Sequence, residues 1–221
     1  MSMKRILLST TALAFFFASC QNAPEADQAQ TADAVEVTAT DGPTHKADPA
    51  NSKFEFIGTK PVAQHHGTIQ LKDGQLTVSG DVITGGTFVF DLNTLVTDDQ
   101  DSDGNAKLTG HLKSADFFDV ENHPDATFEI VSVTAGVAES DDLIAKDATH
   151  TVTGNLTMKG VTKSITFPAK VEINDSQVSA QANFNIDRTQ WGLVYGNDQS
   201  LGDKFIRPEV NIQLQLQAQK L

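Results

Sequence analysis

The sequence predicts an all-β protein whose antiparallel sheet is closed into a barrel or folded into a sandwich. Three observations support this. From residue 51 onward apolar residues alternate with polar ones, turn-forming residues separate the runs, and few stretches have helical spacing. Because one face of each run is polar, the strands are expected to be antiparallel. About eight to ten strands are expected, and a barrel of about eight strands can enclose side chains or one ligand.

The strand segments follow one another in order. The first, SKFEFIG, places Phe54 and Phe56 on one face, and GTIQLKDGQLTVSG has the pattern of a hairpin with its turn at residues 72–74. Pro168 interrupts a later run, which indicates an edge position or a bulge. The other runs carry these alternating apolar residues: Phe88, Phe90 and Leu92; Phe128 and Ile130; Val152, Leu156 and Met158; Ile165, Phe167, Ala169, Val171 and Ile173; Val178, Ala180, Ala182, Phe184 and Ile186; Val210, Ile212, Leu214, Leu216 and Ala218.

The stretch GHLKSADFFDVENHP, residues 110–124, lacks the strand alternation. Three apolar residues follow one another at the spacing of about two helical turns: Leu108, Leu112 and Ala115. With Pro124 ending the run, we expect a short helix that caps one end of the barrel. Phe117 or Phe118 is expected to turn inward, and truncating the buried one to alanine should cost about 3 kcal/mol or more. His123→Ala should have little effect.

The N-terminal residues have the features of an export signal. Two basic residues precede an apolar stretch, residues 6–18, that is too short to span a bilayer. The sequence FASC, which ends at the single cysteine Cys20, resembles a bacterial lipobox, with Phe17 in place of the usual leucine. We therefore expect a signal peptide over residues 1–19 and acylation of Cys20. Gln21 is not the aspartate that marks inner-membrane retention, which favours the outer membrane.

Residues 20–50 are rich in Ala, Thr, Gln, Asp and Glu and show no amphipathic period. They are expected to be a disordered tether that follows the acylated cysteine. The flexible part, from Gln21 to about Asp48, has about 28 residues and would give an average reach of roughly 30 Å. The folded domain is then expected to occupy residues 51–221, in a membrane-anchored protein that faces the periplasm in the cell envelope.

Charge and composition argue against several functions. The formal net charge of −13, without a long basic run, argues against nucleic-acid binding. With a single cysteine, disulfides and thiol catalysis are not expected. No nucleophile elbow, phosphate loop or dinucleotide fingerprint is present, so no catalytic residue is assigned and an enzyme is not expected.

An acidic run, DDQDSDGNAKLTG, partly fits a calcium loop. Asp99, Asp101, Asp103 and Gly104 match the loop, but the twelfth position is Gly110 instead of a bidentate glutamate. We interpret this run as a solvated acidic loop, and calcium binding at residues 98–104 is left open. His65 and His66 would point to opposite faces of a strand, so no designed metal site is expected.

Three segments in order resemble the YceI-like family of polyisoprenoid-binding, lipocalin-like proteins. They are HLKSADFFDVENHPDATFEI (111–130), VTGNLTMKGVTKSITFPAKV (152–171) and FNIDRTQWGL (184–193). The resemblance covers roughly residues 51–221, and the opening SKFEFIGTKPVAQHHGTI is most similar to a lipoprotein-bearing branch. It implies an antiparallel lipocalin-like barrel with a deep apolar channel and no catalytic residues.

The resemblance also implies a function: binding a long-chain isoprenoid or related lipid as a carrier or store, with no other cofactor. The alternative is a ligand-free structural or partner-binding envelope module. Arg188 and Trp191 are expected either to clamp a ligand at the pocket mouth or to close a barrel end through an internal Arg–carboxylate bond. A homodimer is left open. The expected pocket residues are Phe88, Phe90, Phe128, Phe167, Phe184, Ile186, Arg188 and Trp191.

Overall fold

The computed structural model describes residues 22–38, 42–137 and 143–221, so the expected signal peptide and Cys20 lie outside the described residues. The elements are β1 (Asp27–Gln28), β2 (Gln30–Asp33), β3 (Thr44–Ala47), β4 (Lys53–Lys60), β5 (Ala63–Ser79), β6 (Val82–Thr97), α1 (Ser102–Lys113), β7 (Asp125–Ala135), β8 (His150–Met158), β9 (Val161–Ile173), β10 (Gln177–Asp187), the 3-10 helices η1 (Arg188–Trp191) and η2 (Gln199–Lys204), and β11 (Glu209–Lys220).

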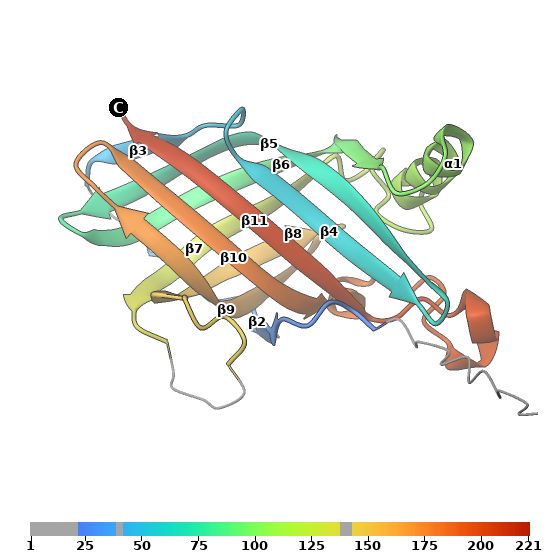
Figure 1. Ribbon diagram of the computed structural model, residues 1–221. Helices are drawn as coiled ribbons and strands as arrows, with labels where there is room; N and C mark the ends of the chain where they lie inside the picture. Colours follow the sequence, from blue (N-terminus) through green and yellow to red (C-terminus); the bar gives the residue numbers. More distant parts are fainter. Residues whose placement is uncertain (1–21, 39–41, 138–142) are drawn as a thin grey trace, which may run out of the picture.

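Eight strands, β4 to β11, form one antiparallel up-and-down barrel (Figure 1). Each of these strands pairs with the next along the chain, and β11 closes the cylinder on β4. β3 lies in the same gap between β11 and β5 as β4 does, farther along both strands. The predicted barrel of about eight strands is confirmed, and the sandwich alternative does not apply.

The alternation of apolar residues places one face of each strand inside the barrel. In β11 the inward-facing residues are those expected from the sequence: Val210, Ile212, Leu214, Leu216 and Ala218. On the outer face, the side-chain amide of Asn211 donates to the Asn183 and Asn185 side chains at 2.7 and 2.9 Å. Burial of the inner face provides the main driving force for folding.

β5 runs without interruption through residues 72–74, so the predicted hairpin turn at that place is wrong. The register of β5 against β6 shifts at Lys72, which is the extra residue of a β-bulge. Gly74 then allows Phe88 to pack against the strand, since a Cβ on Gly74 would stand 2.6 Å from the Phe88 ring. Asp73 and Gly74 form the kind of Asp-Gly pair that is typical of tight turns, but here they lie at a bend within one long strand.

The N-terminal strap, residues 22–37, contradicts the expected disordered tether. β1 pairs in parallel with β10, and β2 pairs with β9 in antiparallel fashion. β10 pairs with β9 only from Val178 to Gln181, so the rest of the facing edges of these two strands is not paired to each other. The strap forms hydrogen bonds with these free backbone groups. On this edge of β9, Pro168 lies between the residues that pair with β2 and those that pair with β10, so it pairs only with β8 on the other side. This agrees with the expected edge position.

Side chains of the barrel and of the strap hold the strap in place. The Asn155 amide donates to the Val35 carbonyl at 2.6 Å and accepts from the Val35 N–H at 3.0 Å. The Asn185 amide donates to the carbonyl of Pro24 at 3.2 Å. The carboxylate of Asp27 accepts from two amides of the loop between β7 and β8, at 2.9 and 2.8 Å. The strap is thus attached by hydrogen bonds and not by an apolar face. For this reason its sequence lacks the alternation of apolar residues that is typical of a strand.

The short helix expected at one barrel end is present as α1, but it begins earlier than its apolar spacing suggested. Asp101, predicted to lie in a solvated loop, is the N-cap and accepts from the Gly104 N–H at 2.7 Å. The helix ends at Lys113, and the turn that follows buries Phe117. The predicted solvated loop is therefore right for residues 98–101, which are exposed and non-helical, and wrong from Ser102 onward, where α1 begins.

Phe117→Ala is expected to lower the free energy of unfolding by about 3 kcal/mol or more, because the ring is buried under α1 and its removal leaves a cavity. Phe118, only partly buried, should have a smaller effect. Urea denaturation of both variants measures the difference, with His123→Ala as a control expected to change little. Equal losses for the two phenylalanines would contradict this assignment.

Candidate functional site

The barrel encloses a long apolar cavity of about 550 Å³. Its walls are inward-facing side chains of all eight barrel strands, together with α1, η1 and residues 193–206. At one end the lining residues Leu76 and Val178 are almost completely buried. At the other end the lining residues Tyr195 and Lys204 are exposed. The cavity is therefore closed at the end of the β5–β6 turn and opens beside α1 and η2, an opening called the mouth below.

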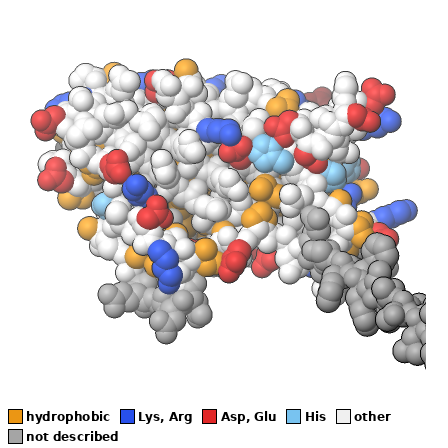
Figure 2. All heavy atoms as spheres, viewed as in Figure 1, with side chains coloured by type: hydrophobic (Ala, Val, Ile, Leu, Met, Phe, Trp, Pro, Cys, Tyr) orange, Lys and Arg blue, Asp and Glu red, His pale blue; other side chains and the backbone are white. Residues whose placement is uncertain are grey.

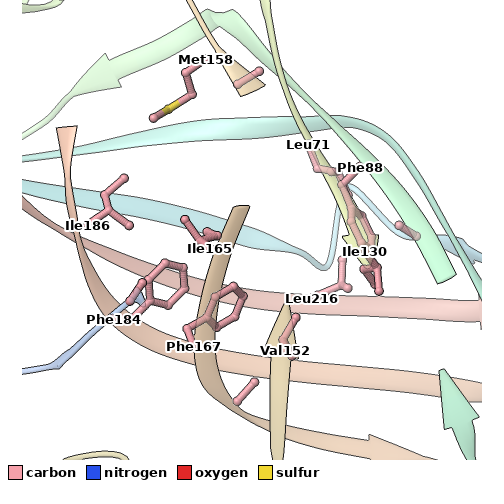
Figure 3. Packing of buried hydrophobic residues seen from close by; sticks show 14 of the residues in the cluster. Leu71, Phe88, Ile130, Val152, Met158, Ile165, Phe167, Phe184, Ile186 and Leu216 are labelled. Carbon is pink, nitrogen blue, oxygen red and sulfur yellow. The ribbon is translucent and has the colours of Figure 1, made fainter. Parts of the chain in front are cut away.

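The residues predicted to form a pocket line this cavity with one exception. Those that line it are Phe88, Phe90, Phe128, Phe167, Phe184, Ile186 and Arg188. Figure 3 shows Phe167 and Phe184 side by side, and their rings are stacked with centroids 4.0 Å apart. Phe128 lies 6.0 Å from Phe167, centroid to centroid. These strands thus provide a continuous aromatic wall.

The exception is Trp191, which does not line the cavity. Its side chain is completely buried at η1, and its indole N–H donates to the carbonyl of Leu156 at 2.9 Å. Of the two roles expected for Trp191, clamping a ligand at the pocket mouth is therefore wrong, whereas closing a barrel end fits. Trp is large enough to fill this position and its single donor is satisfied by β8.

Arg188 is 2% exposed and binds backbone carbonyls. Its guanidinium donates to four of them: those of Leu193, Tyr195, Ile206 and Arg207. Burial lowers the pKa of Arg188, and its charge also lies 5.5 Å above the ring of Phe117. Among the described residues the alternative Arg–carboxylate bond is not formed, and the nearby Asp187 carboxylate instead accepts from the N–H and hydroxyl of Thr189. Arg188 thus holds residues 193–207 in place at the mouth.

Two glycines allow aromatic rings to lie flat on the barrel wall. A Cβ on Gly154 would stand 2.3 Å from Phe128, and one on Gly67 would stand 2.3 Å from Phe56. Because the neighbouring strand has no side chain at these positions, the rings cover the wall without filling the interior. The sequence showed the phenylalanines, but not the glycines that keep them out of the channel.

Polar atoms at the mouth were not recognised from the sequence. The hydroxyl of Thr59 and Nε2 of His111 are buried and have no hydrogen-bond partner among the described residues, and both side chains line the cavity. The His111 ring packs edge-on against Tyr195, with centroids 4.5 Å apart. Thr59 lies on β4, His111 on α1 and Tyr195 in the loop after η1, with no shared sequence pattern, so only the fold could bring them together.

His66 lies on the other face of β5 from His65 and bridges two carboxylates. Its Nδ1 is 2.5 Å from Asp98 and its Nε2 is 2.9 Å from Glu55. Because both ring nitrogens face acceptors, the doubly protonated ring fits this site best. The carboxylate of Asp98, followed by that of Glu55, raises the pKa of His66. Lys53 also pairs with Glu55, and its hydrogen bond lowers the pKa of that carboxyl.

His66→Gln is expected to lower the melting temperature more at about pH 5.5 than at about pH 8.5. The folded-state pKa of His66 lies above 6.5, so its stabilising charge is fully present below that value. It is lost as the pH rises through the folded-state pKa, while Glu55 stays ionised throughout this window. Thermal denaturation at the two pH values measures the difference. A loss that grows with rising pH would contradict this assignment.

The remaining polar candidates are engaged in local contacts. The Asp99 carboxylate contacts the His65 ring at 2.9 Å and accepts from the His66 N–H at 3.1 Å, whereas Asp101 caps α1. In the part of the chain that the structure describes, no group of three or more His, Cys, Asp or Glu side chains is arranged to hold a metal ion. None of the described helices has the length and hydropathy needed to cross a bilayer.

The family model for the YceI-like domain matches residues 45–218. A UPF0312 protein from Pseudomonas putida is 34% identical over 126 residues, which are 56% of this chain and 59% of the relative. Protein YceI from Salmonella arizonae is 36% identical over 94 residues, 39% of this chain and 44% of that protein. The alignments thus span about half the length of these relatives.

Two solved structures have the same fold. BcnA from Burkholderia cenocepacia superposes with a TM-score of 0.59 at 19% identity, over 77% of this chain and 98% of BcnA. A polyisoprenoid binding domain from Saccharophagus degradans, implicated in plant cell wall breakdown, also gives 0.59, at 18% identity, over 80% of this chain and 98% of that domain. Both superpositions take in nearly all of the solved chain and support the barrel described above.

Proposed function

Because the chain belongs to the YceI-like family, we propose that it is an envelope lipoprotein whose barrel binds a long-chain isoprenoid or related lipid, as a carrier or store. The observation that carries the proposal is the apolar cavity of about 550 Å³, closed at one end and open at the other. Its volume lies within the usual range for ligand sites, roughly 300–1,000 Å³. A flexible hydrocarbon chain fits a long channel with a single opening.

The chemistry of the lining supports this ligand class. Stacked and edge-on aromatic rings cover the walls, so affinity would come from hydrocarbon removed from water. The unpartnered Thr59 hydroxyl and His111 Nε2 at the mouth would suit a ligand with a polar end group. The similarity to a solved polyisoprenoid binding domain adds support for a lipid ligand.

The proposed role is binding and not catalysis, and no cofactor other than the lipid is included. The continuous cavity argues against the alternative of a ligand-free module with an interior filled by side chains. Acylation at Cys20 would anchor the protein to the envelope, on the periplasmic side and at the outer membrane. Two or more acyl chains are needed for durable anchoring.

The test is to purify the protein from its native host, extract it with organic solvent and identify bound lipids by mass spectrometry. A hydrocarbon-chain lipid in near-stoichiometric amount is the expected result. Repeated extracts without such a lipid would overturn the proposal. Intact-mass analysis of the same sample reports separately whether Cys20 is acylated.

A further inference from the structure

Exposed apolar side chains surround the mouth. Four large hydrophobic residues there are between 45% and 64% exposed: Val62, Val194, Tyr195 and Leu201. Val62 is in the turn between β4 and β5, and the others belong to the segment that connects η1 to η2 and to η2 itself. Exposed apolar residues that gather around an opening mark an interaction surface more strongly than scattered ones do. We call these four residues the mouth rim.

The two parts of the mouth rim form one surface. The N–H of Arg207 donates to the carbonyl of Thr59 at 3.0 Å, and the N–H of Ile206 donates to the carbonyl of Gly196 at 2.7 Å. Figure 1 shows the β4–β5 turn beside η2 at the same end of the barrel. At that right-hand end, Figure 2 shows hydrophobic side chains close to basic and histidine side chains. The β4–β5 turn and the segment from Val194 to Leu201 thus lie side by side at the mouth.

The N-terminal strap brings the proposed lipid anchor to this end of the barrel. Asn185, which holds the Pro24 carbonyl at 3.2 Å, lies three residues before Arg188, and Arg188 holds the mouth segment. Cys20 precedes Pro24 by four residues. Four extended residues span at most about 14 Å. An acylated Cys20 in a bilayer would therefore keep the mouth end of β10 close to the lipid head groups.

From these placements we infer that the mouth rim docks on the surface of a lipid bilayer, so that the cavity opens toward the membrane and lipid can enter without crossing water. This inference rests on the proposed lipid anchor and lipid-binding function. It adds an orientation: the mouth faces the membrane, and the closed end faces away. A long flexible tether would have left the orientation of the barrel undetermined.

The charges around the rim suit a surface that inserts by its apolar side chains. Lys60 and Lys204 line the mouth, and Asp198 and Asp203 lie on the same segment as Leu201. The two lysines and two aspartates balance in formal charge, although the whole chain carries −13. Docking is therefore expected to depend weakly on salt, in contrast to adsorption through basic patches.

The test uses nitroxide labels on the acylated full-length protein in vesicles of phosphatidylethanolamine with phosphatidylglycerol as the minority lipid. Since Cys20 is the single cysteine, an introduced cysteine is the free thiol for labelling after acylation. Val62→Cys and Leu201→Cys report on the rim. Val82→Cys is the matched control, because Val82 is also exposed but is the first residue of β6, next to the β5–β6 turn at the closed end.

The expected result is a higher ratio of oxygen to water-soluble nickel accessibility at Val62 and Leu201 than at Val82. A water-like ratio at both rim positions would overturn the docking inference, and so would an equal, lipid-like ratio at all three. Labelling of the wild-type chain would show that Cys20 is free, which removes the anchor and the docking inference with it. Lipid extraction remains an independent test of the cavity's ligand.

Discussion

Replacing Arg188 with methionine is expected to lower the free energy of unfolding by roughly 3–5 kcal/mol. Methionine keeps much of the aliphatic volume but removes all donors to the four backbone carbonyls that hold residues 193–207. Hydrogen bonds from a charged group contribute about 1.5–3 kcal/mol each and are not additive, so the total is set below their sum. For a chain of this size the melting temperature should fall by about 6–20 °C.

Guanidinium unfolding of the variant measures this loss. Lys204→Met is the matched control, since Lys204 is exposed on the same segment and should change stability little. Arg188→Lys keeps the charge but replaces the planar fork by a single ammonium, so it should recover only part of the loss. A change of less than about 1 kcal/mol in Arg188→Met would mean that the carbonyl contacts do not stabilise the mouth segment.

Ala180→Trp is expected to remove the bound lipid while leaving the barrel folded. Ala180 faces the cavity from β10 and is only partly buried, so a larger side chain there extends into the channel. An indole would occupy space that a hydrocarbon chain needs. The lipid extracted per protein should fall roughly tenfold or more, the equivalent of about 1.4 kcal/mol in binding.

Gln181→Trp provides the control for this experiment. Gln181 is the next residue of the same strand and points outward, so the same indole is added outside the cavity. Its lipid content should match that of the wild type, measured by mass spectrometry on samples with equal circular dichroism. Wild-type lipid content in Ala180→Trp would contradict the cavity as the binding site.

The strands and their buried faces could be predicted because alternation is a local property of the chain, whereas the choice of a barrel over a sandwich came from the family resemblance. Within each strand every second residue is apolar, as at Phe167 in β9, Phe184 in β10 and Leu216 in β11. A strand with one apolar face must bury that face. The same logic predicted most of the cavity lining, since residues that face inward in a barrel also line whatever space remains inside it. A buried aromatic at a barrel end, Trp191, cannot be told from a channel aromatic by this pattern.

Other features depend on partners far away in the chain. The Lys72 bulge has the local signals of a turn, and only pairing with β6 shows that β5 continues. The strap has no apolar period, yet Asn155 and Asn185 hold it on the barrel from 120 and 161 residues away. Hydrogen bonds to exposed backbone need no side-chain pattern, so sequence reasoning has no signal for them.

By itself the sequence determined an antiparallel all-β fold, its inward-facing residues, a helix near one end and a family resemblance that implied the barrel. The tertiary structure decided that the channel stays open, that it opens at one end, and that the N-terminal strap leads to that end. The physical reason is that alternation is encoded residue by residue. Whether an interior is filled, and where it opens, depends on how glycines, rings and carbonyls from distant strands meet in space.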